Sequence, residues 1–248
     1  MLLKISFQLI NSKSVTTINL EENLLRVKKE IERCAVISGR DANSVKLITV
    51  SKTRSLEEVE AVVALGQSCL GENTVQDAMT KIPHFSSQDM EWHFIGHLQS
   101  KKAGKLPGYF QWIHSIDSIK LAKKLSSALS SHSKNSVLNC LIQVNVSDEA
   151  TKSGLQLDEV ETFLQEVLQY DLPCLRWRGL MTIGVRSNEE KTRHAFSQLR
   201  ELQQACNKQF HLENFDQLSM GMSGDYCLAI EEGATMVRVG TSIFGERS

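Results

Sequence analysis

The sequence predicts an α/β fold, a closed (β/α)8 TIM barrel with one extra helix before its first strand. Three observations predict it: β-rich and helical segments alternate along the chain, eight β-rich runs can be counted, and no low-complexity linker interrupts them. The 248 residues suit this fold in one domain. An open doubly wound sheet is the alternative, but no Gly-x-Gly-x-x-Gly follows the first predicted strand.

Composition narrows the classes of protein and partner. With 28 basic and 29 acidic side chains the net charge is −1, and no long basic stripe predicts a nucleic-acid partner. No run approaches the roughly 20 apolar residues of a membrane span. Six cysteines lie far apart without a Cys-x-x-Cys pair, which argues against a zinc ribbon or a secreted disulfide scaffold. We therefore expect reduced thiols in a cytoplasmic protein.

The N-terminal part divides into an extension and the start of the domain. Residues 1–18 contain lysines and hydroxyl residues but no acid, and we expect a disordered or strand-like extension rather than a transit-like leader. Residues 19–248 form the predicted barrel domain. Its first helix is expected at residues 19–38, with Asn19 and Glu22 as a capping box and Gly39 as its end.

The remaining elements follow in order. Strands are expected where β-branched and aromatic residues cluster, at residues 45–52, 68–71, 92–96, 112–116, 137–146, 177–182, 215–220 and 235–239. Helices are expected where apolar residues recur at helical spacing, at residues 55–65, 74–82, 118–131, 158–170, 188–210 and 225–233. Ser55 and Glu58 form a second capping box. The basic segment at residues 99–105 is predicted to be a mobile solvated loop, with a lid or a partner surface as the alternative.

A barrel carries its site where strands end and the following loops begin. The residues at these ends are Lys52, Asn73, Gly96, His97, Ser115, Asn145, Met181, Ser219, Gly240 and Thr241. Closure also places the eighth strand beside the first, so Lys52 and Arg238 should be neighbours at one rim. His93 and His97 have the i, i+4 spacing of a metal pair, but Gly96 and the strand break the required helix, so no metal site is expected.

Two small-residue loops near the C-terminus suggest a phosphate site. Ser223 and Gly224 follow the seventh strand, and Gly240 and Thr241 follow the eighth. Exposed backbone N–H groups and hydroxyls in such loops bind phosphate. Asp225 complicates this interpretation, because as a helix cap it would compete for the same N–H groups.

Lys52 and Arg238 add the chemistry of an aldehyde and a flat ring. Burial and a neighbouring cation lower a lysine pKa, and the neutral amine forms a Schiff base with an aldehyde. Arginine is one of the partners that protein sites offer to a pyridine nitrogen. Together with the phosphate site, the pair describes pyridoxal phosphate (PLP). Either residue alone has a structural interpretation, Lys52 as a solvated strand end and Arg238 as an ion-pair partner.

At these residues the sequence resembles the pyridoxal phosphate homeostasis proteins, single-domain relatives of the alanine racemase N-terminal barrel. The motifs that carry the resemblance are LITVSKTRSLEEV, GENTVQDA, WHFIGHLQSKKAGKL, LIQVNVSDEATKSGL, RGLMTIGV and LSMGMSGDYCLAIEEGATMVRVGTSIFGER. They span most of residues 45–247 in the same order, which makes coincidence improbable. One departure is Lys101-Lys102, where relatives commonly have Asn-Lys.

The resemblance implies roles for individual residues. Lys52 would carry PLP as a Schiff base, Arg238 would face the ring nitrogen, and Asn73 would approach the ring substituents. The phosphate would be held by Ser223, Gly240 and Thr241, with Ser219 close by. Lys152 matches a second lysine position of the family and would contact cofactor or partner.

The resemblance further implies a protein that carries or buffers PLP, with little catalysis of its own. We expect a monomer, with PLP-dependent enzymes as clients. An arginine beside the ring leaves its nitrogen unprotonated, which makes the ring a poor electron sink. The chain ends at Ser248 just past the barrel, so no second domain is expected to supply an opposing acid/base residue. Two alternatives remain: a PLP-dependent amino-acid racemase, and a cofactor-free aldolase that uses Lys52.

Overall fold

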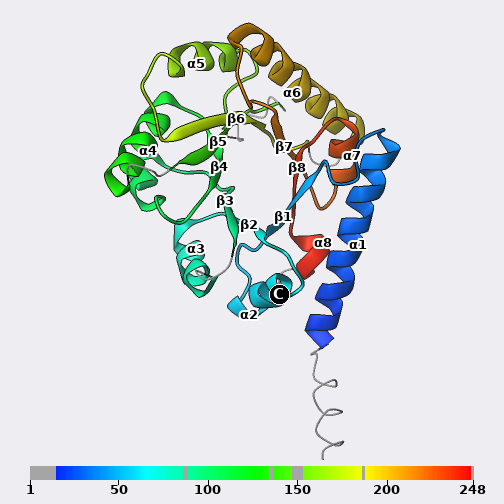
Figure 1. Cartoon of the computed structure of the whole chain (residues 1–248). Helices are drawn as coiled ribbons and strands as arrows, with labels where there is room; N and C mark the ends of the chain where they lie inside the picture. The colour runs from blue at the N-terminus through cyan, green and yellow to red at the C-terminus, as the bar shows by residue number, and fades with distance from the viewer. Residues whose placement is uncertain (1–14, 86–88, 134–136, 147–152, 186–187, 247–248) are drawn as a thin grey trace, which may run out of the picture.

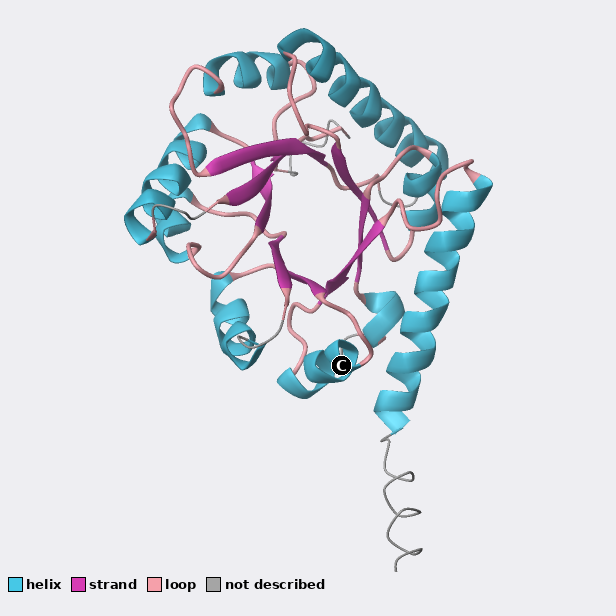
Figure 2. Cartoon of the chain, in the orientation of Figure 1, coloured by secondary structure: helices cyan, strands magenta, loops and turns pink. Residues whose placement is uncertain are grey.

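The computed structural model describes residues 15–85, 89–133, 137–146, 153–185 and 188–246. Eight parallel strands close into a barrel in sequence order (Figures 1 and 2). The strands are β1 Lys46–Val50, β2 Cys69–Glu72, β3 Glu91–Phe94, β4 Trp112–Ile116, β5 Leu138–Gln143, β6 Leu175–Met181, β7 Gln217–Met222 and β8 Met236–Val239. Closure is made by β1 and β8, where Ile48 lies opposite Arg238. The predicted closed barrel is confirmed.

Helices surround the barrel (Figure 2). They are α1 Val15–Ile37, α2 Leu56–Ala64, α3 Val75–Lys81, α4 Ile119–His132, α5 Glu159–Val167, α6 Glu189–Phe210, α7 Tyr226–Glu231 and α8 Thr241–Phe244, with 3-10 helices η1 Ile82–Phe85 and η2 Ser100–Lys105. Among the described residues, no helix combines the length and apolarity that a membrane span requires.

The two predicted capping boxes have different outcomes. At α2 the Ser55 hydroxyl accepts from the Glu58 N–H, and the Glu58 carboxylate accepts from the Ser55 N–H, as predicted. The box at Asn19 was wrong, because α1 begins at Val15 and places Asn19 inside the helix. An exposed asparagine inside a helix costs only about 0.7 kcal/mol, so this residue type could not fix the boundary.

The basic segment after β3 is also corrected. It forms η2, which packs against α4, and Leu98, Ala103 and Leu106 in and beside η2 are nearly inaccessible to solvent. Burial of these three apolar side chains holds the segment in place, although its lysines suggested a mobile loop. Helix α8 was not predicted, because it has only four residues.

Helix α1 lies along α7 and α8 on the outside of the barrel (Figure 1). This packing brings Cys34 of α1 and Cys227 of α7 together in a disulfide across 193 sequence positions. The expectation that all cysteines are reduced was therefore wrong for this pair, because separation in sequence does not report separation in the fold. The other four, Cys69, Cys140, Cys174 and Cys206, are free thiols.

The core has two parts. Most buried apolar side chains lie between the strands and the helices. The barrel interior holds a smaller apolar cluster of Ile48, Trp112, Leu141, Met181 and Met236. Buried polar side chains of β3, β4, β7 and β8 complete this interior, and they lead to the site.

Candidate functional site

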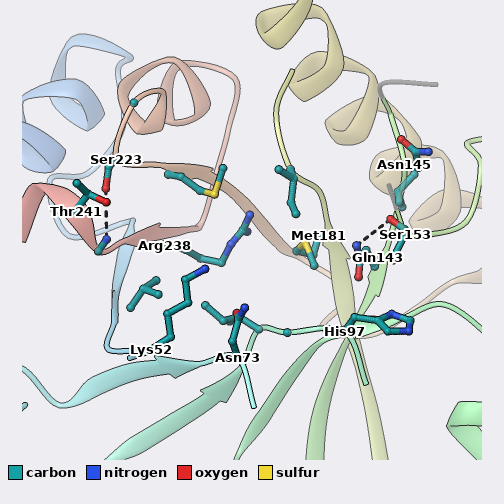
Figure 3. Close-up of a pocket in the computed structure, with 18 of the residues that line it drawn as sticks. Lys52, Asn73, His97, Gln143, Asn145, Ser153, Met181, Ser223, Arg238 and Thr241 are labelled. Carbon is teal, nitrogen blue, oxygen red and sulfur yellow. Dashed lines mark hydrogen bonds between the residues drawn. The ribbon is translucent and has the colours of Figure 1, made fainter. Parts of the chain in front are cut away.

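A pocket of about 620 Å³ opens at the carboxyl ends of the strands (Figure 3). Six of the predicted cofactor-binding residues line it: Lys52, Asn73, Ser223, Arg238, Gly240 and Thr241. Lys52 and Arg238 point into the same space, with Ser223 and Thr241 on one side of them (Figure 3). The pocket therefore brings together the amine, the guanidinium and the two small-residue loops. Lys152 lies outside the described residues.

Arg238 is held inside the barrel mouth by two hydrogen bonds. Its side chain is 5% exposed. Nη1 donates to Ser219 Oγ at 2.6 Å and Nη2 donates to the Thr182 carbonyl at 2.8 Å. Burial lowers the pKa of Arg238 to about 10, against the opposing attraction of Asp225. The guanidinium stays charged at neutral pH, and an arginine has five N–H donors, more than these two bonds use.

Ser219 does not line the pocket. It is fully buried beneath Arg238, and its hydroxyl also lies 2.8 Å from His114 Nδ1. Its place in the predicted site is therefore behind the guanidinium rather than on the pocket wall. The alternation of side chains along β7 explains this, because Ser219 points into the barrel one layer below the rim.

The phosphate-type loops meet as predicted. The N–H groups of Gly240 and Ser242 both point at Ser223 Oγ, at 3.4 and 3.3 Å, so they converge on one oxygen position. Crowding favours glycine at position 240, because a Cβ there would lie 3.2 Å from the Val50 carbonyl oxygen. Asp225 does not cap α7 with its side chain, and instead accepts from the Met222 N–H at 2.6 Å. The expected competition for the N–H groups is thereby removed.

Sequence reasoning missed a group of charged residues behind Lys52, which we call the ion cluster: Glu72, Asp77 and Lys81. Lys81 Nζ lies 2.8 Å from Glu72 Oε1 and 3.0 Å from Asp77 Oδ1. Lys81 and Glu72 are almost fully buried. The available signal was Lys81 itself, a charge three residues after Ala78 on the apolar face of α3.

The ion cluster contacts the chain on both sides of Lys52. Lys81 Nζ donates to the Ser51 carbonyl at 2.8 Å, and the Ser51 hydroxyl donates to Glu72 Oε1 at 2.7 Å. On the other side, the Thr53 N–H donates to Asp77 Oδ2 at 2.8 Å. Thr53 has φ 62°, and the left-handed region costs a non-glycine residue about 1 kcal/mol or more. The cluster thus fixes the backbone that carries Lys52.

Burial and hydrogen bonding act in opposite directions on the carboxyl groups of the ion cluster. Burial raises the pKa of Glu72 to about 7, although hydrogen bonds from Lys81 and Ser51 act in the opposite direction. Burial also tends to raise the pKa of Asp77, but hydrogen bonds from the Thr53 N–H and from Lys81 outweigh it and leave that pKa lowered.

The fold and the site together define the class of protein. A single barrel whose last strand presents an arginine beside a lysine that follows the first strand is an alanine racemase-type barrel, and the family model for the alanine racemase N-terminal domain matches residues 19–248. The pyridoxal phosphate homeostasis protein of Vibrio alginolyticus is 42% identical over 234 residues, with 92% of this chain and 96% of the relative covered. The Escherichia coli K12 protein of the same name is 38% identical, with 92% and 97% covered.

The chain belongs to the family of pyridoxal phosphate homeostasis proteins, which confirms the resemblance indicated by its motifs. Among solved structures, PipY of Synechococcus elongatus PCC7942 with PLP bound has a TM-score of 0.78 and 32% identity, with 91% of this chain and all of that chain covered. Alanine racemase from Corynebacterium glutamicum is 15% identical with a TM-score of 0.67, and supports the fold.

Proposed function

We propose that this protein binds PLP as a Schiff base on Lys52 and carries or buffers it within the cell. The observation that carries the proposal is the pairing of β1 with β8, which puts Lys52, Arg238 and the phosphate-type loops around one pocket. The name and the PLP-bound structure of the family members support it.

The residues fit the cofactor group by group. PLP supplies an aldehyde that condenses reversibly with a lysine amine, and a ring that withdraws electrons when its nitrogen is protonated. Lys52 would hold the aldehyde carbon, and Arg238 would donate to the ring nitrogen. Asn73 lies on the same wall, where it would contact the ring substituents. The phosphate would be held by Ser223, Gly240 and Thr241, where the N–H groups of the second loop converge on the Ser223 hydroxyl of the first.

A buffering role follows from the properties of Arg238. Its pKa of about 10 keeps it a donor at neutral pH, so it leaves the ring nitrogen unprotonated and the ring weakly activated. A PLP-dependent racemase is the alternative. Incubation of the PLP-loaded protein with single-enantiomer alanine or serine separates them, because loss of optical purity that disappears in Lys52→Ala contradicts a purely buffering role.

Reductive labelling tests the binding mode. We expect a yellow protein that is bleached by borohydride, with the pyridoxyl mass on the peptide that contains Lys52. Lys52→Ala should remain unlabelled, whereas Lys124→Ala, at an exposed position of α4, should label as the wild type does. A protein that stays colourless after PLP is added contradicts the proposal and favours the cofactor-free aldolase.

We further propose a cytoplasmic monomer whose clients are PLP-dependent apoenzymes. The four scattered free thiols support a reducing compartment, whereas the Cys34–Cys227 disulfide is of a kind that is rare there. Light scattering at several concentrations tests the monomer, and cell fractionation tests the compartment. Transfer of labelled PLP to an apoenzyme, measured against free PLP at the same concentration, tests delivery.

A further inference from the structure

A continuous chain of hydrogen bonds, buried except at its Glu91 end, runs from Arg238 to the opposite end of the barrel. His114 Nδ1 lies 2.8 Å from Ser219 Oγ, and His114 Nε2 lies 2.9 Å from His93 Nδ1. His93 Nε2 then lies 2.8 Å from Glu91 Oε1. Glu91 is the first residue of β3 and pairs with Lys46, the first residue of β1. We call Glu91, His93, His114 and Ser219 the relay.

The groups at the two ends of the relay indicate which atom donates in each of its hydrogen bonds. Arg238 can only donate, so the Ser219 oxygen accepts from it, which leaves the Ser219 proton available to donate to His114 Nδ1. His114 must then carry its proton on Nε2 and donate to His93 Nδ1. His93 in turn carries its proton on Nε2 and donates to Glu91. An ionised carboxylate only accepts, so with neutral imidazoles the Glu91 end requires this assignment, and the Arg238 end is compatible with it.

Burial makes this direction costly to change. Ser219, His114 and His93 are all fully buried, so no bulk water replaces a lost bond. Burial lowers the pKa of both histidines, and each protonation would place two donors at one contact. The groups that face them are Lys46 and Glu91 at one end and Arg238 at the other.

We propose that the relay is a positioning device for Arg238, with His114 and His93 as positioning residues that never touch the cofactor. This inference rests on the proposed PLP site. The relay keeps the lone pairs of the Ser219 hydroxyl directed at Arg238, and with the Thr182 carbonyl it anchors both terminal nitrogens of the guanidinium. The remaining N–H groups are thereby held in one orientation for the ring nitrogen.

The ring nitrogen offers a readout that a purely structural role would not change. A 1-deaza analogue of PLP keeps the aldehyde and phosphate but lacks this nitrogen. The wild type should bind PLP more tightly than the analogue. In Ser219→Ala and His114→Phe we expect that preference to fall by about tenfold, mainly through weaker PLP binding. Ser219→Thr keeps the hydroxyl and should restore it.

Two comparisons keep the inference testable. Met236→Leu changes a neighbouring interior residue outside the relay and should leave the preference unchanged. Relay variants that fold and retain the wild-type preference overturn the proposal. Nitrogen-15 spectra of wild-type imidazoles provide a measurement that needs no variant: both histidines should carry a proton only on Nε2, and an Nδ1–H on either overturns the assignment. Failure of PLP to bind at all instead contradicts the proposed function.

Discussion

The two nitrogen groups of the site are supported in different ways. Lys52 is supported from outside the barrel by the ion cluster, which binds the backbone of Ser51 and Thr53. Arg238 is supported from inside the barrel by the relay, which binds the tip of its side chain. In one case the protein fixes the main chain, and in the other it fixes the functional group.

The difference matches what each residue must do. A lysine that forms and releases a Schiff base needs a mobile side chain on a fixed base, and its four-carbon stem supplies that mobility. An arginine that donates to a ring nitrogen needs a fixed plane, because hydrogen bonds weaken steeply with misalignment. The two supports also differ in charge: the ion cluster contains charged side chains, whereas the two histidines inside the relay are neutral.

The largest effect on stability is expected from a substitution that breaks the ion cluster. Lys81→Met removes the cation beside Glu72 and leaves a buried carboxyl that must be desolvated or protonated. We expect a loss of about 3 kcal/mol in the free energy of unfolding, measured by urea denaturation. Lys124→Met, at an exposed position of α4, should cost less than about 0.5 kcal/mol. A Lys81→Met loss as small as this control would show that the cluster does not stabilise the fold.

Titration sharpens the comparison, because the two supports respond to pH with opposite signs. The pKa of Glu72 is raised from 4.5 to about 7 in the folded protein, so its contribution to stability is present below pH 4.5 and is lost as pH rises through 7. The folded pKa values of His93 and His114 are lowered from 6.5, so their contribution is present above pH 6.5 and is lost as pH falls. Each group contributes a slope of at most about 1.4 kcal/mol per pH unit.

Substitutions can separate the contribution of Glu72 to the pH dependence of stability from that of the histidines. Below pH 6.5, His114→Phe should lose less stability on acidification than the wild type does, whereas Glu72→Gln should lose more. The measurement is urea denaturation from pH 5 to 8. Identical pH profiles for all three proteins would contradict the assignment of the buried titrations to these groups.

The fold and the residues of the pocket wall could be predicted from the sequence, because both depend on local patterns and on barrel closure. Alternating β-rich and helical segments predicted the barrel, and parallel closure then placed Lys52 near Arg238. The relay was missed because it joins residues distant in sequence, with Ser219 and His114 separated by 105 positions. The Cys34–Cys227 disulfide likewise depends on the packing of α1 against α7, which the spacing of cysteines in the sequence does not predict. The ion cluster is local, and its signal, Lys81 on the apolar face of α3, was overlooked.

The smallest expected effect tests whether the ion cluster acts on Lys52 through hydrogen bonding or through charge. Asp77→Asn keeps an oxygen that can accept from the Thr53 N–H but loses the charge 3.0 Å from Lys81. Because the Asp77 side chain is 27% exposed, solvent screens this pair, and we expect a loss of about 1 kcal/mol or less with PLP affinity nearly unchanged. Asp77→Ala removes the acceptor as well and should lower PLP affinity, since the left-handed Thr53 beside Lys52 is then released. Equal affinities in fluorescence titrations of the two variants would show that the backbone at Lys52 is fixed by Ser51 and β1 alone.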